Sequence, residues 1–586
     1  MLCALLASFV VGQAGAPEAP DYEASLVSWA LAQVGRELES NPEGKRVEEV
    51  LVASENIFAK DDLFPPFLNV FHWKTRESVI RREVLLVEGA TFELDRAKET
   101  ERNLRRLPIL AVAKVVAVKG KEGGVGVLVV TKDQWSLRLN SEFNLVGTLL
   151  RYLHLQGAEN NFLGENQQAA VDLELVLDKV WLGEIFVNRR VAGLPLFIGE
   201  SAKVAFNRAS GAPEGVQLNA QVGKPMYTLS DRWGLAVDVR FFKARQRQYR
   251  GANVWQLPYA EADGTTSNVP YIYDAKELRG TAAATWSTGT AWKFDLTGAV
   301  GGFTLAYTPP SRLGLSDAQS AWLTQNYLPL TQDVFFVAAQ ARVFEPRFTV
   351  LRNVDTFVLS EDTREGLSVT STVRTALPLA ASMARYVELS GTATYRWVFH
   401  DNYLSASMAG SVRLWPGVAA FNRRFAWELY EATPPVGGGR FVFRGVGYSQ
   451  VNDNSNSRTA LGGGNGLRGT PADFVTGRNY VLGNFEYRTR AFEFRTVYVG
   501  FVLFYDVGSA YDVNPRAVHT VGAGLRILLP QFNRETIRID FGAVVGGEGL
   551  PGFDRMSASF GQVTDYRPDF LSSPFSLLTA RGLGGG

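Results

Sequence analysis

The stretch WGLAVDVRF, Trp233 to Phe241, alternates in character along its length. Its odd-numbered residues are all apolar, whereas Asp238 and Arg240 fall on the opposite side. Because successive side chains of a β-strand point to opposite faces, this pattern predicts a strand with one apolar and one polar face.

The same alternation recurs through most of the chain, for example in WKFDL (292–296), YRWVF (395–399) and TIRIDF (536–541). It begins after Trp135 and continues to about residue 563 without dividing into smaller domains. The composition agrees, because 57 Gly, 12 Trp, 20 Tyr and 37 Phe residues are typical of β-structure with many turns.

Alternating strands occur in soluble β-sandwiches as well as in membrane barrels, so the strand pattern alone does not separate the two. Three features favour a barrel: aromatic residues near the strand ends, charges of both signs on the opposite faces, and the uninterrupted length. At roughly 25–28 residues per strand and connection, about 16 strands fit this length. We therefore expect a mainly β fold, with a transmembrane antiparallel β-barrel over residues 135–563 and a tail over residues 564–586.

Charge and hydropathy narrow the class of protein further. The chain has 60 basic and 59 acidic residues and a formal net charge of +1, so it lacks the basic excess of a nucleic-acid-binding surface. Outside the N-terminal stretch, no apolar run approaches the roughly 18 residues that a membrane-spanning helix needs. An integral membrane state would therefore have to be a β-barrel, the other structure that satisfies its backbone hydrogen bonds in lipid.

The N-terminal stretch MLCALLASFVVGQAGA is apolar but too short to span a membrane. Its end, Ala14-Gly15-Ala16, has the small-x-small form of a signal-peptidase site, so residues 1–16 are interpreted as a signal peptide. A buried helix of a cytosolic domain is the alternative. Cys3 is the single cysteine, so removal of this segment would leave a chain without disulfides or thiol chemistry.

Two further segments precede the barrel. Residues 17–45 contain apolar residues at helical spacing, and Pro42-Glu43-Gly44 ends the pattern. Residues 46–134 then read strand, helix, helix, strand, strand, in the stretches RVEEVLVAS, TRESVIRREVLL, ELDRAKETERNLRRL, AVAKVVAVKG and GVGVLVVTKD. This order predicts a compact α+β module.

The stretch GNGLRG, Gly464 to Gly469, matches the G-x-G-x-x-G fingerprint of dinucleotide-binding enzymes, and Glu486 follows about 20 residues later. That fingerprint requires a buried strand before it and a helix after it. Here a polar loop precedes it, and Pro471 and Gly477 interrupt the residues that follow. No helix is available to hold a pyrophosphate, so we reject a nucleotide site.

The wider segment LGGGNGLRGTPADFVTGRNYVLGNFEYRTR (461–490) resembles the signature region of the BamA/TamA superfamily of outer-membrane assembly and translocation proteins. In that family a loop with the motif (Val/Ile/Leu)-Arg-Gly-(Phe/Tyr) folds back into the barrel. Leu467, Arg468 and Gly469 match this motif, and Thr470 stands where the family has an aromatic residue.

The resemblance also implies partners for the loop arginine on the next two strands. Glu486 matches the family's inward glutamate, and Phe504 and Asp506 match its Phe-x-Asp pattern. Alternation supports this placement, because the odd-numbered residues of VYVGFVLFYD (497–506) form an apolar outer face and leave Phe504 and Asp506 inside. We expect Arg468 to bridge Asp506 with Glu486 close by; an ordinary solvated loop arginine is the alternative.

The module over residues 46–134 resembles a POTRA domain, the periplasmic unit of the same family, on the residues LNVFHWKTRESVIRREVLLVEGATFELDRAKETERNLRRLPIL with Gly89 and Phe92 at the turn between the helices. At the other end, MSASFGQVTD (556–565) resembles the family's last strand, with Val563 where an aromatic residue is expected.

The resemblance implies a bacterial outer-membrane protein, with its N-terminal domain in the periplasm, that inserts or translocates other proteins. Its expected partners are outer-membrane lipid, unfolded or secreted protein substrates, and periplasmic chaperones or accessory lipoproteins, but no nucleic acid. A dedicated transport pore is the main alternative, and a passive adhesion barrel is a third.

The sequence shows no motif for covalent chemistry. The four histidines, His72, His154, His400 and His519, have no metal-ligand spacing, and His72 is expected to have a packing role. We find no Ser-His-Asp arrangement, phosphate-binding loop or cysteine cluster, and Asp61-Asp62 is interpreted as a solvated pair. We therefore expect no enzyme activity, cofactor or metal.

Overall fold

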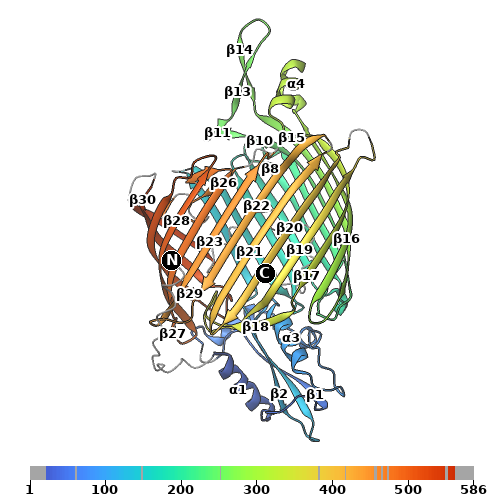
Figure 1. Cartoon of the computed structure of the whole chain (residues 1–586), viewed down its shortest axis with the longest axis vertical. Helices are drawn as coiled ribbons and strands as arrows, with labels where there is room; N and C mark the ends of the chain where they lie inside the picture. The colour runs from blue at the N-terminus through green and yellow to red at the C-terminus, as the bar shows by residue number, and fades with distance from the viewer. Residues whose placement is uncertain are drawn as a thin grey trace.

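The computed structural model describes residues 22–59, 62–146, 149–250, 253–380, 383–415, 417–453, 458–462, 466–470, 474–547 and 552–560. Within them, a large antiparallel barrel has a small α+β module at one end and a projection at the other (Figure 1). The expected signal peptide, Val563 and the tail over residues 564–586 lie outside the described residues.

The module contains the strands and helices that the sequence predicts. The strands β1 (Val47–Glu55), β2 (Leu110–Lys119) and β3 (Val125–Asp133) form a sheet in the order β1-β3-β2. β1 runs parallel to β3, and β2 runs antiparallel to it. The helices α2 (Glu77–Arg81) and α3 (Leu94–Arg105) lie in the connection between β1 and β2.

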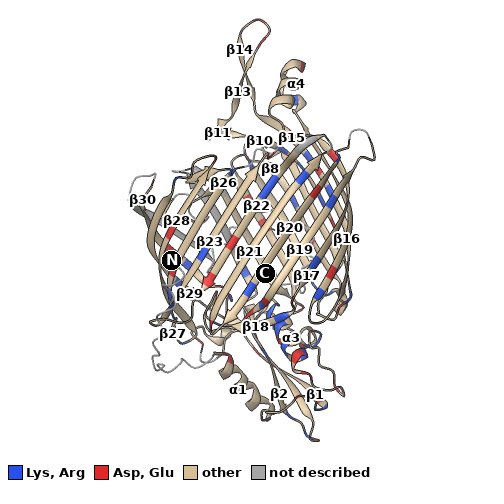
Figure 2. Cartoon of the chain, in the orientation of Figure 1, with Lys and Arg blue, Asp and Glu red and all other residues tan. Residues whose placement is uncertain are grey.

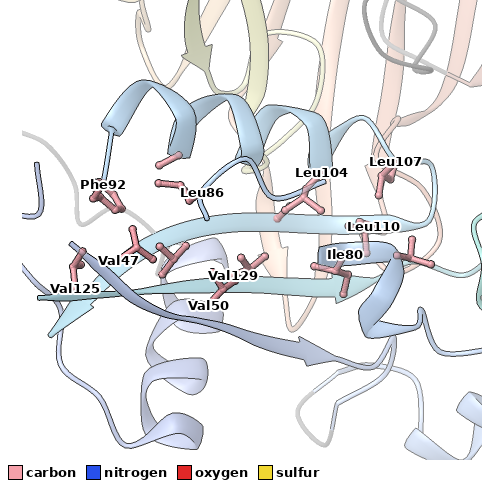
Figure 3. Packing of buried hydrophobic residues seen from close by; sticks show 14 of the residues in the cluster. Val47, Val50, Ile80, Leu86, Phe92, Leu104, Leu107, Leu110, Val125 and Val129 are labelled. Carbon is pink, nitrogen blue, oxygen red and sulfur yellow. The ribbon is translucent and has the colours of Figure 1, made fainter. Parts of the chain in front are cut away.

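The module's hydrophobic core lies between these helices and one face of the sheet (Figure 3). Ile80 of α2 and Leu104 of α3 are fully buried in a cluster that also contains Val47 and Val129 of the sheet. Each such side chain contributes about 1.5–3 kcal/mol when it is removed from water. β3 is buried along its whole length, which explains its nearly continuous apolar sequence.

The helical segments are shorter than the sequence predicts. α1 (Tyr22–Val34) ends at Gly35, whose φ of +62° suits glycine, and not at Pro42-Glu43-Gly44. Leu38 is therefore outside the helix and forms a bridge to Val118, at the edge of β2. α2 stops at Arg81, because the chain turns there toward α3. In the described part of the chain, no helix combines the length and the apolar character needed to cross a membrane.

The barrel wall consists of long strands that pair in chain order. They are β4 (Leu137–Val146), β5 (Leu149–Phe162), β6 (Gln167–Val176), β7 (Lys179–Asn188), β8 (Phe197–Asn207), β9 (Pro213–Lys224), β10 (Trp233–Arg247), β15 (Ile272–Thr288), β16 (Lys293–Thr308), β17 (Gln332–Phe344), β19 (Glu361–Leu377), β20 (Tyr386–Phe399), β21 (Asn402–Trp415), β22 (Val418–Ala432), β23 (Gly439–Val451), β26 (Asn479–Thr489), β28 (Val497–Tyr511), β29 (Val518–Leu528), β30 (Ile537–Gly546) and β31 (Gly552–Phe560). In the sheet order β31 is the neighbour of β4, which closes the ring.

The expected number of about 16 strands is too low. The ring contains twenty strands of nine or more residues, together with the short pieces β18 (Arg347–Leu351) and β27 (Phe492–Phe494), all within the described residues. The 424 residues from Leu137 to Phe560, divided by twenty strands, give about 21 residues per strand and connection. Many connections are tight turns, so the sequence estimate of 25–28 residues assigned too much of the chain to loops.

The predicted division into an outer and an inner face is confirmed on β28. Phe501, Leu503 and Tyr505 are exposed on the outside, whereas Phe504 and Asp506 are buried on the inside. Figure 2 shows Lys, Arg, Asp and Glu residues distributed along the barrel strands, as the alternating sequences require. On β28 the outer face is therefore apolar, and the inner face carries the charge of Asp506.

A projection extends beyond the barrel at the end opposite the module (Figure 1). It contains the hairpin β13 (Gln256–Ala260) and β14 (Thr266–Pro270), the helix α4 (Asp317–Asn326), and the two-residue strands β11 (Tyr249–Arg250) and β12 (Asn253–Val254). Leu257, Val269 and Leu323 form its small core.

The module is fixed to the near end of the barrel by a bidentate ion pair. Arg105 Nε and Nη2 donate to Asp362, near the start of β19, at 2.7 and 2.6 Å. Arg105 is almost fully buried in this contact. α1 adds a second attachment, because Glu23 accepts a hydrogen bond from the Ser360 backbone N–H at 2.9 Å and pairs with Lys114 at 2.8 Å.

Candidate functional site

The candidate site begins with the loop that carries the arginine motif. Residues 466–470 lie between the short strands β24 (Thr459–Leu461) and β25 (Val475–Gly477), which pair with each other. The loop folds against the inner face of the barrel wall, where Leu467, Arg468 and Thr470 are at most 4% exposed. Gly464 of the fingerprint stretch lies outside the described residues.

The expected contact between Arg468 and Asp506 is present. Asp506 Oδ2 accepts hydrogen bonds from Arg468 Nε at 2.9 Å and from the Arg468 backbone N–H at 3.1 Å, and Oδ1 accepts one from Nη2 at 2.6 Å. Asn484 Nδ2 donates to Asp506 Oδ1 and to the Gly466 carbonyl, both at 2.8 Å. Side chain and backbone of the loop are thus held at the same carboxylate, and charge-assisted bidentate bonds of this kind are among the stronger ones in proteins.

Glu486 is the second carboxylate that contacts the arginine. Arg468 Nη1 donates to Glu486 Oε1, and Arg488 Nε donates to Glu486 Oε2 at 2.6 Å. The pairing of β26 with β28 puts Glu486 directly opposite Phe504 and close to Asp506. The sequence-predicted residues of both strands therefore meet at one guanidinium.

Phe504 and nearby glycines shape the wall where the loop lies. The Arg468 guanidinium carbon is 3.7 Å from the centroid of the Phe504 ring, a distance suited to a cation–π contact. Gly469 has a φ of +79°, and a Cβ there would lie 2.3 Å from the Gly542 carbonyl carbon. A Cβ on Gly522 would lie 2.3 Å from Phe504 Cζ. Glycine at these positions permits the close approach of loop and wall.

Three further charged residues complete the cluster. Asp540, on β30, accepts hydrogen bonds from Arg526 Nη1 at 2.6 Å and pairs with Arg538 Nε at 3.1 Å. Asp540 Oδ2, the oxygen that pairs with Arg538, also lies 3.7 Å from Arg468 Nη1. With Arg488, the cluster contains four guanidiniums and three carboxylates, so it carries a net positive charge.

The sequence patterns did not predict that Arg526, Arg538 and Asp540 belong to this cluster. The alternation of TIRIDF already placed Arg538 and Asp540 on the polar face. It could not show that β30 lies level with the loop, because this depends on the stagger of the closed sheet. Arg526 and Asp540 are each at most 1% exposed, so their pairing is needed to offset the cost of burying their charges.

The sequence shows no Ser-His-Asp arrangement, but the structure brings a serine, a histidine and an aspartate together at one place. His72 Nε2 lies 2.9 Å from Asp133 Oδ2, and its Nδ1 lies 3.2 Å from Ser136 Oγ. The three side chains come from positions up to 64 residues apart, at the junction between module and barrel. The side chains of His72 and Asp133 are at most 1% exposed, and Ser136 as a residue is 1% exposed. The three side chains are thus closed to solvent, and His72 contributes hydrogen bonds as well as packing to the junction.

The described residues contain no group of three or more His, Cys, Asp or Glu side chains that could hold a metal ion. Asp61 lies outside the described residues, whereas Asp62 is buried and pairs with Lys132 at 3.2 Å, which contradicts its interpretation as a solvated charge.

No family model and no curated protein matches the sequence. Among solved structures, the chain is similar to BamA from Haemophilus ducreyi lacking POTRA domains 1–3, with 12% identity, 96% of each chain covered and a TM-score of 0.34. It is also similar to CdiB from Escherichia coli, with 10% identity, 90% of this chain and 79% of that chain covered, and a TM-score of 0.41.

CdiB from Acinetobacter baumannii matches with 11% identity, 88% and 73% coverage and a TM-score of 0.38. All three likenesses are at 12% identity or less and concern the fold alone.

Proposed function

We propose that this chain is an outer-membrane barrel of the BamA/TamA superfamily that inserts or translocates other proteins, with the module over residues 46–134 as a POTRA-like domain in the periplasm. The observation that carries the proposal is the loop arginine, Arg468, bound inside the barrel to Asp506 and Glu486. Burying a guanidinium is costly unless it is fully paired, so these contacts hold the loop at one defined place on the barrel wall.

The loop acts as an internal brace in this proposal. Its contacts join β26, β28 and β30, which are close to β31 in the sheet order. β31 and β4 are the last and first strands, and their seam is where the barrel would open toward lipid. Strands tied together by the Arg468 cluster would move as one unit during such an opening, so the brace sets which part of the wall stays fixed.

Substrate capture is assigned to the edge of the module's sheet. An extended chain can add to a free strand edge through main-chain hydrogen bonds, with little demand on its sequence. β1 and β2 are the two edge strands, and each is covered over part of its length: the Glu39 N–H donates to Ala117 O of β2 at 2.9 Å, and the Val47 N–H of β1 donates to Ala90 O at 2.8 Å. We assign capture to the remaining part of the β1 edge, residues Leu51–Glu55, because it leads toward the barrel.

A dedicated transport pore is the second candidate, and exposed charged residues in the barrel lumen favour it. Arg240 and Arg279 are opposite each other on β10 and β15, point inward and are both exposed. Arg279 pairs with Glu277 at 3.4 Å, and the remaining repulsion between the two guanidiniums requires water to screen it. A ring of twenty strands is wide enough to hold a water-filled channel, so a substrate could pass through the lumen instead of into the lipid.

Depletion of the protein followed by proteomics of outer membranes separates the two candidates. A general insertase predicts the loss of many barrel proteins from the outer membrane. A dedicated pore predicts that one or a few substrates accumulate in the periplasm while the barrel proteins stay at their normal level. That second result would contradict the insertase.

A further inference from the structure

The segment that follows β1, residues 62–76, runs along the periplasmic rim of the barrel and is called the rim segment here. At one end, Leu63 N donates to Thr496 Oγ1 beside β28 at 3.4 Å. The ring centroids of Phe64 and Phe532, in the turn between β29 and β30, are 5.0 Å apart. This end is fixed to the last strands of the barrel.

The other end of the rim segment is fixed to the first strands. His72 Nδ1 lies 3.2 Å from Ser136 Oγ, directly before β4. The Trp73 carbonyl accepts a hydrogen bond from Asn161 Nδ2 at 2.8 Å, close to the turn between β5 and β6. Since β31 and β4 are neighbours in the sheet, the rim segment crosses the seam between the last and first strands.

Between these attachments lies the 3-10 helix η1 (Pro66–Phe71), whose side chains have an inverted polarity. Phe67, Val70 and Phe71 are 69%, 77% and 63% exposed. The polar residue of the helix, Asn69, faces the protein instead and exchanges hydrogen bonds with the Phe58 backbone at 3.1 and 2.9 Å. A helix with apolar groups outside and its amide inside is suited to apolar surroundings.

The apolar outer surface of the barrel begins close to the rim segment, because His72 contacts Ser136, the residue before β4. Leu137 and Leu139 are 49% and 74% exposed on the outside of β4, which starts beside the rim segment. Trp73, 45% exposed, follows η1 in the chain and packs against Phe162 at the end of β5, with ring centroids 5.4 Å apart. Aromatic residues at such a boundary are typical of membrane–water interfaces.

We propose that η1 is a lipid-binding wedge, which inserts Phe67, Val70 and Phe71 into the periplasmic leaflet below the seam between β31 and β4. The occupant is the bilayer itself, because the wedge lies at the rim beside the start of β4, where the exposed leucines Leu137 and Leu139 of the outer wall begin. The inference goes beyond the proposed function and rests only on the membrane location of the barrel. A wedge there perturbs lipid packing beside the strands that would open.

The chain's single cysteine, Cys3, allows a direct test on the full-length protein. After Cys3→Ser, an environment-sensitive fluorophore is attached at one new cysteine: Val70→Cys in the wedge, Val300→Cys on the outer wall, or Val87→Cys at the far end of the module. All three are exposed valines, at 77%, 44% and 61%. The labelled proteins are folded into vesicles of phosphatidylethanolamine and phosphatidylglycerol, with and without a nitroxide on the acyl chains.

The wedge predicts that the Val70 and Val300 labels both shift to blue emission and are both quenched by the nitroxide lipid, whereas the Val87 label is neither shifted nor quenched. A quenched Val300 label beside an unquenched Val70 label would overturn the wedge and leave the barrel location intact. If neither label is quenched, the membrane location and the wedge both fail. A Val70 label that is shielded only when an unfolded client chain is added would assign this surface to protein substrates and overturn the lipid assignment.

Discussion

Arg468 and Asp506 are 38 residues apart in the sequence and share three hydrogen bonds in the barrel interior, one of them from the Arg468 backbone. The carboxylate thus fixes both the position of the side chain and the path of the loop. A lysine could supply the charge but not the two parallel guanidinium bonds. The attachment of the loop to the barrel wall therefore requires an arginine at position 468.

Arg468→Ala should destabilise the folded barrel by about 3–5 kcal/mol, because it leaves a buried carboxylate without its main partner. Arg468→Lys should fall between wild type and alanine. The measurement is the temperature at which the folded form is lost on denaturing gels. Arg458→Ala is the control, since Arg458 is an exposed arginine paired with Asp512 at 2.7 Å and should change little. If the two alanine variants lose the folded form at the same temperature, Arg468 does not brace the barrel.

Gly469→Ala should weaken the seating of the loop although it adds a single methyl group. The φ of +79° costs a non-glycine residue about 1–2 kcal/mol, and the Cβ would also collide with the Gly542 backbone. Gly298→Ala is the matched control, because a Cβ there has no atom within 4 Å. Trypsin cleavage after Arg468 reports seating: we expect it in the Gly469 variant and not in the control. Full protection of both would show that the loop tolerates the methyl group.

Docking of α1 should weaken in acid. Burial alone raises the pKa of Glu23, but the Lys114 ammonium and the hydrogen bonds from Ser360 outweigh it and hold this pKa below its usual value of 4.5. Because the folded pKa is the lower one, the stabilisation is present above about pH 4.5 and is lost as the pH falls through the folded pKa. Backbone hydrogen exchange in α1, corrected for intrinsic rates, should rise over this range, and Glu23→Gln should abolish the dependence.

Arg105→Ala should loosen the module from the barrel. The substitution removes the bidentate pair with Asp362 and the contact with Glu101, both largely buried. We expect faster hydrogen exchange at the start of β19 and in the loop before it, with the module's own core still protected. Arg81→Ala breaks an exposed pair with Glu77 in the same module and is the control. If exchange rises equally in both variants, the ion pair does not hold the two parts together.

The sequence predicts the wall of the barrel well because period two is a local property. Phe501, Leu503 and Tyr505 are outside and Asp506 is inside, as the alternation in one strand requires. The order of strands and helices in the module is also predicted from local patterns, with period two for the strands and helical spacing for the helices. The number of strands is not predicted correctly, because it depends on the lengths of the connections. The alternating pattern does not distinguish a tight turn from a short loop.

The candidate site could be predicted only in part. The motif supplied Arg468, and alternation supplied Glu486 and Asp506 on neighbouring strands. Arg526 and Asp540 join the cluster through the stagger of the closed sheet, which local patterns do not encode. His72 and Asp133 meet across 61 residues at a junction between two folded parts, so neither spacing nor periodicity could reveal their contact.

The most direct test of the central claim is reconstituted insertion. The purified protein is placed in phosphatidylethanolamine and phosphatidylglycerol vesicles, a chemically unfolded outer-membrane barrel protein is added, and its folded, heat-modifiable form is measured over time. We predict that wild type and Arg458→Ala accelerate folding of the client, whereas Arg468→Ala does not. A client that folds at the same rate in empty vesicles and in vesicles holding the wild-type protein would contradict the account.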